Sequence, residues 1–244
     1  METRAGCIQY APKSKASKKC FGERGFIGCV SSRELDGIMD LIKPGSVVLD
    51  VGCGHCGPLL YLAEKNPQSR FIGIDNDPDR IISARKLISG YENVEVHAGE
   101  LSFQGIWHKE IDLAIIIDSF THIEYQQHLL ERLNSFMKPG GRIILWDWTL
   151  PDELMRFPLF TCLNNAEQFV TVSDCKDMLN RSRFMNVQAI DDTERAAEQI
   201  EKWLKSVADD ENCLECSYFQ HWAMTLMIVE MGILRHFRII AQRY

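Results

Sequence analysis

The sequence lacks any long apolar run. Two of its uninterrupted apolar stretches, Leu113–Ile117 and Ile143–Trp146, span only five and four residues, whereas a helix that crosses a bilayer needs about 20. The first four residues (METR) also lack the apolar character of a signal peptide. These absences predict a protein without a membrane span and favour a cytoplasmic location.

Positive charge is also scarce. The 244 residues contain 27 Lys and Arg against 34 Asp and Glu, which gives a formal net charge of −7. Proteins that bind nucleic acid usually present a surplus of Lys and Arg to the phosphates, so we expect no nucleic-acid partner. Residues 12–24 are locally basic, and we predict that residues 1–30 form an arm. This arm either closes as a lid over the site or is simply solvated.

The cysteines form no obvious disulfide framework. There are nine of them, an odd number, scattered along the chain, which predicts reduced thiols. Two pairs, Cys53 with Cys56 and Cys213 with Cys216, have the spacing of zinc ligands. However, Cys53 lies in a glycine turn whose backbone is needed for another ligand. The second pair lies in a helical stretch, where a thiol packs as a small apolar group. We therefore expect no metal site.

Strand and helix patterns alternate from residue 31 onward, which predicts an α/β fold with a doubly wound sheet. A capping box, Ser31-x-x-Glu34, opens a first helix over 31–42. The alternation lapses over about 150–181, which indicates a helical insertion after the fifth strand of a single domain, residues 31–244. Strands are predicted over 46–51, 70–75, 94–97, 111–117, 142–148, 184–190 and 236–242. Further helices are predicted over 57–65, 77–89, 123–137, 152–166, 173–182, 192–207 and 212–231.

A glycine turn joins the first predicted strand to the helix after it. The pattern Gly52-x-Gly54-x-x-Gly57 has the strand-before, helix-after context of a nucleotide-binding turn. Glycines allow a tight turn and a close approach of the backbone to a ligand. The pattern alone fits a dinucleotide as readily as other nucleotide cofactors.

Two carboxylates make the prediction more specific. Asp50, two residues before Gly52, would repel a pyrophosphate but attract the cationic amino group and sulfonium of S-adenosylmethionine. Asp75 ends the second predicted strand, where a carboxylate can accept both ribose hydroxyls. The alternative is that Asp50 and Asp75 merely cap neighbouring helices.

The turn Lys138-Pro139-Gly140-Gly141, which leads into the fifth strand, adds a third feature. With it, the chain from about residue 21 to 244 resembles the class I S-adenosylmethionine-dependent methyltransferases. The resemblance implies a Rossmann-like, seven-stranded sheet whose last strand is antiparallel. It also implies a set of cofactor-binding residues. These are Asp50, Gly52 and Gly54 for the methionine part, Asp75 and Asn76 for the ribose, Glu100 and Leu101 for the adenine, and Asp118.

A second motif, Asp118-x-x-x-His122, follows the fourth predicted strand at the edge where open α/β sheets bind ligands. Imidazole titrates near neutral pH, so His122 is the candidate general base that would deprotonate an acceptor amine. The alternative for His122 is a capping or packing role.

Together with the segment 21–27 (FGERGFI), this motif resembles the phosphoethanolamine N-methyltransferases and related small-amine enzymes. The resemblance implies that Tyr10 pairs with His122 over the acceptor and that Asp118 lies near the amine. That family grips its phosphate with Arg and Tyr side chains after the fifth strand. Residues 163–169 (LNNAEQF) contain no Arg, Lys or Tyr, and Trp148 occupies the place of one family Tyr.

A dianionic phosphate would be poorly held without such donors, so a cationic or neutral amine fits better than phosphoethanolamine. Asp118 and Glu167 would attract the amine, and Trp148 would form either a cation–π wall or part of the core. We therefore predict a methyltransferase that acts on the nitrogen of a small molecule. The alternatives are O- or C-methylation of a phenol, carboxylate or quinone precursor, a non-catalytic cofactor-binding protein, and a dinucleotide reductase.

Overall fold

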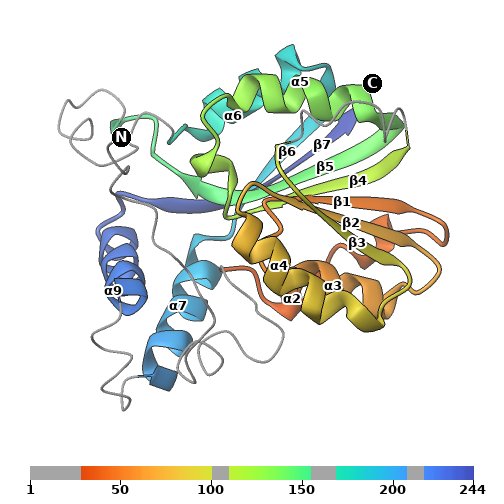
Figure 1. The fold of residues 1–244 in the computed structure, drawn as a ribbon. Coiled ribbons are helices and arrows are strands. Elements are labelled where there is room, and N and C mark those ends of the chain that lie inside the picture. The colour runs from red at the N-terminus through yellow and green to blue at the C-terminus, as the bar shows by residue number, and fades with distance from the viewer. Residues whose placement is uncertain (1–28, 101–109, 155–168, 208–216) are drawn as a thin grey trace, which may run out of the picture.

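The computed structural model describes residues 29–100, 110–154, 169–207 and 217–244. At its centre lies one seven-stranded sheet with the order β3-β2-β1-β4-β5-β7-β6 (Figure 1). Strands β1 to β5 run parallel, and β7 is antiparallel to both β5 and β6. The predicted seven-stranded sheet with an antiparallel last strand is therefore confirmed. The strands are β1 (Val47–Val51), β2 (Arg70–Asp75), β3 (Val94–Ala98), β4 (Ile111–Ile117), β5 (Met137–Thr149), β6 (Phe184–Asp191) and β7 (Arg235–Arg243).

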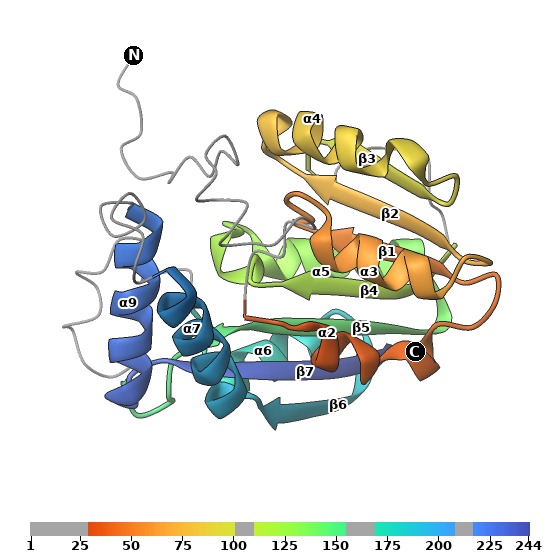
Figure 2. The same ribbon diagram turned by 90° about the horizontal axis from the view of Figure 1, so that it is seen from below.

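Helices cover both faces of the sheet (Figures 1 and 2). The α-helices are α2 (Ser32–Asp36), α3 (Gly57–Lys65), α4 (Pro78–Leu87), α5 (Gln126–Phe136), α6 (Val172–Arg181), α7 (Thr193–Val207) and α9 (Ser217–Glu230). Three short 3₁₀ helices, η1 (Met39–Leu41), η2 (Ile88–Gly90) and η3 (Phe120–His122), lie between them. Helices α5 and α6 pack on one face, and α2, α3 and α4 pack on the other.

The central strands are apolar on both faces because each face is covered. In β4, Leu113 and Ile115 belong to the core under α2, α3 and α4, whereas Ala114 and Ile116 belong to the core under α5 and α6. A third cluster packs α7 and α9 around Trp148. This two-sided burial explains the continuous apolar runs of the sequence.

The first helix and the fifth strand differ most from their predicted bounds. The first helix ends at Asp36, with Gly37 as its C-cap, because the bonding then changes to the i→i−3 pattern, in which the N–H of Ile38 bonds to the carbonyl of Leu35. The η1 turn follows. The turn at residues 138–141 lies within β5, where the register against β4 shifts between Ile111 and Leu113. The glycines there are therefore part of an irregular strand rather than of a separate loop.

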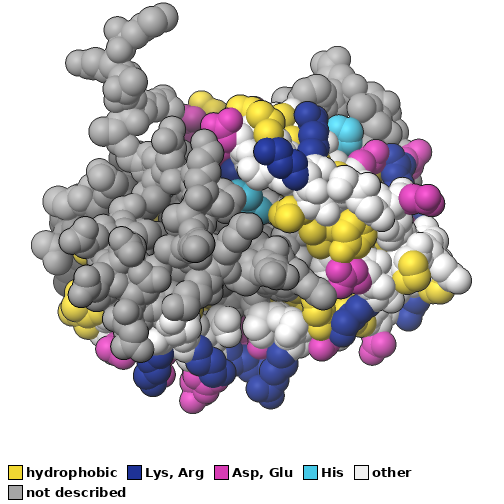
Figure 3. Space-filling model, turned by 60° about the horizontal axis from the view of Figure 1, so that its bottom comes forward, with side chains coloured by type: hydrophobic (Ala, Val, Ile, Leu, Met, Phe, Trp, Pro, Cys, Tyr) yellow, Lys and Arg dark blue, Asp and Glu magenta, His cyan; other side chains and the backbone are white. Residues whose placement is uncertain are grey.

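The segment before α5 also differs from its prediction. A helix was expected from about residue 123, but η3 precedes it and α5 begins at Gln126. Several predicted segments lie largely outside the described residues: residues 155–166 of the helix expected over 152–166, residues 212–216 of that over 212–231, and residues 1–28 of the arm expected over 1–30. Over the described part of the face in Figure 3, Lys and Arg side chains alternate with Asp and Glu. Among the helices that the structure describes, none has the length and apolar character to cross a membrane.

Candidate cofactor and acceptor site

Four sequence features meet at one edge of the sheet. Asp50 lies in β1, Asp75 ends β2, Glu100 follows β3 and Asp118 follows β4. Because these strands are parallel neighbours, their carboxyl ends lie together, which is where open α/β sheets bind ligands. The topology thus brings the predicted cofactor and acceptor motifs to a single edge.

The glycine turn after β1 needs its glycines for two separate reasons. Gly52 has a φ of +78°, and a Cβ there would lie 2.5 Å from the Cβ and Oγ of Ser119. Gly54 has a φ of +53°, and a Cβ there would meet no atom of the described residues within 4 Å. Gly52 therefore lets the turn pack against the loop after β4, while the backbone at Gly54 stays open to a ligand as far as the described residues go.

Asp75 connects the second strand to this turn. Its carboxylate, only 3% exposed, accepts N–H bonds from Gly54 at 2.8 Å and from Asp77 at 2.9 Å. Arg80 lies 3.9 Å away. The carboxylate is therefore fixed at the turn, at the position predicted to hold a ribose.

Asp50 is a buried acid beside Asp75. Burial first, and then the negative charge of Asp75, raise the pKa of Asp50 to about 8. A buried carboxyl beside a second carboxylate gains most from a cationic ligand, because the ligand would supply the missing counter-charge. This observation fits the predicted sulfonium donor.

The glycine turn also contains His55, which the sequence analysis did not select. Its side chain is buried, and neither ring nitrogen has a hydrogen-bond partner among the described residues. Burial, followed by the charge of Arg80, lowers the pKa of His55. Its position within the glycine turn, between Gly54 and Gly57, was the sequence signal that could have identified it.

The outer cofactor residues lie at the surface. Asn76 and Glu100 are exposed. The N–H of Gly99 bonds to the carbonyl of Asp75, which holds the backbone next to Glu100 against the backbone next to Asn76. Leu101 lies outside the described residues.

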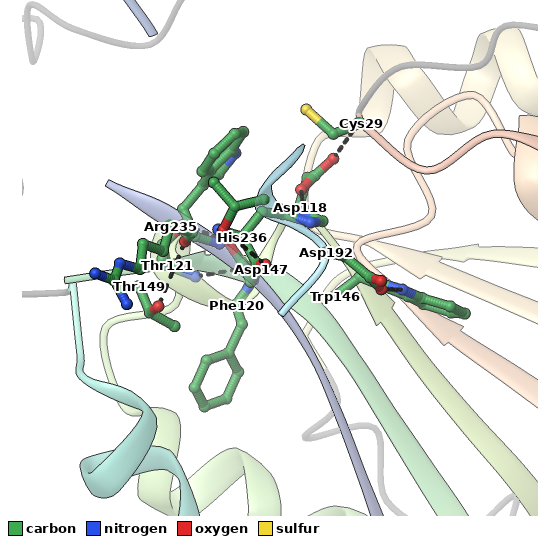
Figure 4. Close-up of polar contacts among 12 residues, drawn as sticks. Cys29, Asp118, Phe120, Thr121, Trp146, Asp147, Thr149, Asp192, Arg235 and His236 are labelled. Atoms are coloured by element: carbon green, nitrogen blue, oxygen red, sulfur yellow. Dashed lines mark hydrogen bonds and ion pairs between the residues drawn. The ribbon is translucent and has the colours of Figure 1, made fainter. Parts of the chain in front are cut away.

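Asp118 adopts a left-handed conformation directly after β4, with a φ of +47°. Its Oδ1 lies 2.8 Å from Nε2 of His236, and its Oδ2 accepts the N–H of Cys29 at 2.6 Å (Figure 4). Burial, and then the charges of Asp118 and Asp147, raise the pKa of the Cys29 thiol well above its usual value. The predicted amine-attracting carboxylate is therefore already held by two partners that sequence reasoning missed.

His236 reaches Asp118 from β7, where it is paired with Trp148 of β5 in the strand register. Burial alone lowers the pKa of His236, but the charge and hydrogen bond of Asp118, with the charges of Asp147 and Asp192, outweigh burial and raise it. The neighbouring carboxylate thus favours the charged form of the imidazole.

Asp147 anchors the loop that carries both acceptor-motif residues. Its Oδ2 accepts the backbone N–H groups of Phe120 and Thr121, and its Oδ1 accepts the Thr121 hydroxyl (Figure 4). Burial, and then the charge of Asp118, raise the pKa of Asp147 to about 6. The η3 turn is thereby fixed to β5.

His122 ends this turn with an exposed side chain. Local desolvation, and then the charge of the nearby His122, lower the pKa of His221 of α9. His122 thus lies near α9, and among the described residues no hydrogen bond or ion pair joins it to Asp118 or His236. Its predicted partner Tyr10 lies outside the described residues.

Trp148 is buried rather than exposed. It packs with Ile200 and Trp222, and its ring meets that of His236 edge-on at 4.8 Å. Trp148 is therefore part of the core, one of the two roles that the sequence left open. Its ring also contacts His236, the partner of Asp118. Glu167 lies outside the described residues.

The first cysteine pair lies in the glycine turn as expected. The Sγ atoms of Cys53 and Cys56 are 3.5 Å apart, and both side chains are buried. Among the described residues no group of three or more His, Cys, Asp or Glu side chains is placed to hold a metal. Cys213 and Cys216 lie outside the described residues.

Comparison with known protein families identifies the domain that contains this edge. A family model described as a methyltransferase domain matches residues 42–211, which include β1 to β6 and both motifs. The chain belongs to this methyltransferase domain family. The match confirms the class I methyltransferase prediction, which was made from the glycine turn, the carboxylates Asp50 and Asp75 and the turn at residues 138–141.

This methyltransferase domain has curated relatives among plant enzymes. It is 32% identical over 135 residues to phosphoethanolamine N-methyltransferase 3 of Arabidopsis thaliana, covering 54% of this chain and 27% of that protein. It is 26% identical over 114 residues to N-methyltransferase 4 of Papaver somniferum, covering 45% and 32%. The chain therefore spans only about a quarter to a third of the length of these relatives.

Solved structures share the fold at low sequence identity. Haemonchus contortus phosphoethanolamine N-methyltransferase 2, in complex with phosphomonomethylethanolamine and S-adenosylhomocysteine, aligns with a TM-score of 0.77 at 14% identity, covering 93% of this chain and 56% of that one. The cyclopropane synthase MmaA2 from Mycobacterium tuberculosis also gives a TM-score of 0.77, at 12% identity, and covers 95% of each chain.

Proposed function

We propose that the chain transfers a methyl group from S-adenosylmethionine to the nitrogen of a small amine. The observation that carries this proposal is the meeting of Asp50, Asp75 and the Asp118 loop around the glycine turn at one sheet edge. The curated relatives named as N-methyltransferases support the choice of nitrogen.

The donor fits the residues at the turn. Asp50 would face the cationic methionine part, the backbone at Gly52 and Gly54 would approach it closely, and Asp75 would accept the ribose hydroxyls. Glu100 is proposed to meet the adenine amine. When bound, the donor supplies an electrophilic methyl group on a sulfonium.

The acceptor is proposed to enter beside the loop after β4. An amine can attack only through a free lone pair, so a protonated amine must first lose a proton. His122 is the proposed base because its ring is exposed at this edge and is not part of the Asp118–His236 pair. Positioned acid–base catalysis contributes about 10²–10⁴-fold.

Asp118 is proposed to accept a hydrogen bond from the amine. Its Oδ1 already contacts His236 and its Oδ2 accepts the N–H of Cys29, so its net pull on a cation is weaker than that of an isolated carboxylate. The site therefore favours a small neutral or singly charged amine. The segment 150–181 is proposed to complete the acceptor pocket, and residues 1–30 to form the arm over it.

An acceptor panel tests this function. Wild-type protein is given radiolabelled donor with small amines, phenols and carboxylic acids, phosphoethanolamine included. Label transfer to amines is expected. Label confined to phenols or acids would replace the proposal with O- or C-methylation.

A second experiment tests the base. His122→Ala is expected to lower the rate with the labelled amine by about 100-fold or more, with donor affinity within about threefold of wild type. The matched control is His128→Ala, because His128 is an exposed histidine of α5 and its loss should change neither value. Equal losses of rate and donor affinity in His122→Ala would make it a binding residue instead.

A further inference from the structure

The Asp118 backbone is held in a costly conformation at the ligand edge. Its φ of +47° lies in the left-handed region, which costs a non-glycine residue roughly 1 kcal/mol, although Asp tolerates it better than most. Its N–H bonds to the carbonyl of Trp146 at 2.8 Å. Such a conformation persists when its surroundings enforce it, and it points to a functional role for the side chain it aims.

The surroundings that aim the carboxylate come from two distant parts of the chain. His236 of β7 lies 2.8 Å from Oδ1, and Cys29, which precedes α2, donates its N–H to Oδ2. Figure 4 shows Asp118 between them. Neither partner is near Asp118 in sequence, so the carboxylate is fixed by the fold rather than by its own loop.

The imidazole of His236 is itself rigidly enclosed. The residue is 1% exposed, the ring of Trp148 packs edge-on against it, and its backbone N–H bonds to Thr193 Oγ1. Its Nδ1 has no hydrogen-bond partner among the described residues. The pair with Asp118 is therefore the polar contact that fixes this ring.

The charges around His236 single out Asp118 as its partner. Asp192, after β6, is paired with Arg238 at 3.2 Å and Arg195 at 3.6 Å. Asp147 of β5 is engaged by the backbone of the η3 turn. Among the described residues, the Asp118 carboxylate has no arginine partner and accepts no bond from the η3 backbone. Its Oδ1 pairs with Nε2 of His236 instead.

We propose that His236 is a positioning residue of the acceptor site, which holds the Asp118 carboxylate in the orientation that receives the acceptor's N–H or O–H group. An ionised carboxylate has about four lone-pair sites, and His236 and Cys29 occupy one each. The Asp118 side chain is 11% exposed, so its remaining sites are not sealed off from the edge. This inference rests on the proposed function, since it needs an acceptor at Asp118.

The first experiment tests the pair without needing any acceptor. Histidine ring nitrogens are followed by NMR against pH in wild type and in Asp118→Asn, with the far-UV circular dichroism spectrum and the urea-unfolding midpoint as the checks on folding. His236 is expected to hold its proton to a higher pH than ordinary histidines in wild type and to lose it at lower pH in Asp118→Asn. Identical titration of His236 in both proteins would overturn the proposed pair.

The second experiment tests the positioning role, with whichever acceptor the wild type methylates. His236→Gln keeps an N–H donor at a similar reach, whereas His236→Leu removes it. The leucine variant is expected to raise the acceptor KM by about tenfold or more, as the loss of a hydrogen bond to a charged group implies. The glutamine variant should stay within about threefold of wild type, and donor Kd should be unchanged in both.

The outcomes separate this inference from the proposed function. An unchanged acceptor KM in His236→Leu, or a KM that rises equally in the glutamine variant, would overturn the positioning role even if amines are methylated. Methylation of phenols alone would overturn the amine proposal and leave the positioning of Asp118 to be judged by the same KM comparison. If no acceptor is labelled, the NMR titration alone decides the pair.

Discussion

Donor binding should release a proton from Asp50. In the free protein, burial and the neighbouring Asp75 raise the pKa of Asp50 to about 8, so most molecules carry a neutral Asp50 at pH 7. A cationic donor favours the ionised form, and binding must therefore expel the proton. With a pKa of about 8, roughly 1% of the carboxyl is ionised at pH 6 and about half at pH 8. The Kd for S-adenosylmethionine should accordingly be roughly 50-fold weaker at pH 6 than at pH 8.

Calorimetry in buffers of different ionisation enthalpy measures both the Kd and the proton released. The control is Asp50→Asn, which binds more weakly but should lose the part of the pH dependence that comes from Asp50. This control is needed because an α-amino group such as the donor's own titrates near 7.7–8.0, at roughly the same pH. Equal pH dependence in wild type and Asp50→Asn would refute the reasoning.

The same group links stability to pH. The folded-state pKa of Asp50 is raised above its ordinary 3.8, so the stability present below pH 3.8 is lost as pH rises toward about 8. Between pH 5 and pH 8 the free energy of unfolding of the donor-free wild type should therefore fall by roughly 4 kcal/mol relative to that of Asp50→Asn, at 1.36 kcal/mol for each pH unit. Urea unfolding at both pH values measures this difference, and parallel curves would contradict it.

Two further substitutions test the packing of the site. Gly52→Ala should destabilise the protein by about 2 kcal/mol or more, since its φ is +78° and the new Cβ would lie 2.5 Å from Ser119; thermal unfolding measures this, and a loss below about 0.5 kcal/mol would be inconsistent with it. Asp147→Ala leaves the buried N–H groups of Phe120 and Thr121 without their acceptor, which should cost about 1–3 kcal/mol for each group. Chemical denaturation checks the second value, and unchanged stability would show that the η3 turn does not depend on Asp147.

Much of the fold was predictable because its signals are local. The apolar run of β4, the glycine turn and the capping box at Ser31 each arise from residues close in sequence. The first and last residues of an element were less predictable where contacts with other parts of the chain determine them. The first helix ends early where the hydrogen bonds change from i→i−4 at Gly37 to i→i−3 at Ile38. Strand β5 includes the predicted turn because its first residues pair irregularly with β4.

The acceptor site was predictable in part. Asp118 and His122 follow a buried strand, so their place at the sheet edge was inferred from the pattern. His236 was not found because it meets Asp118 across 118 residues of chain, through a β5–β7 register that no local pattern specifies. Trp148 was left open between a wall and the core for the same reason, since its burial depends on α7 and α9.

The most direct test of the central claim is calorimetric titration of the wild-type chain and Asp75→Ala with S-adenosylmethionine and S-adenosylhomocysteine. Asp75 is buried at the glycine turn and bonds to Gly54, so its removal should weaken both ligands by at least about tenfold. The wild type should bind each with one site. An absence of heat in the wild type, or an affinity for both ligands in Asp75→Ala equal to that of the wild type, would contradict the account.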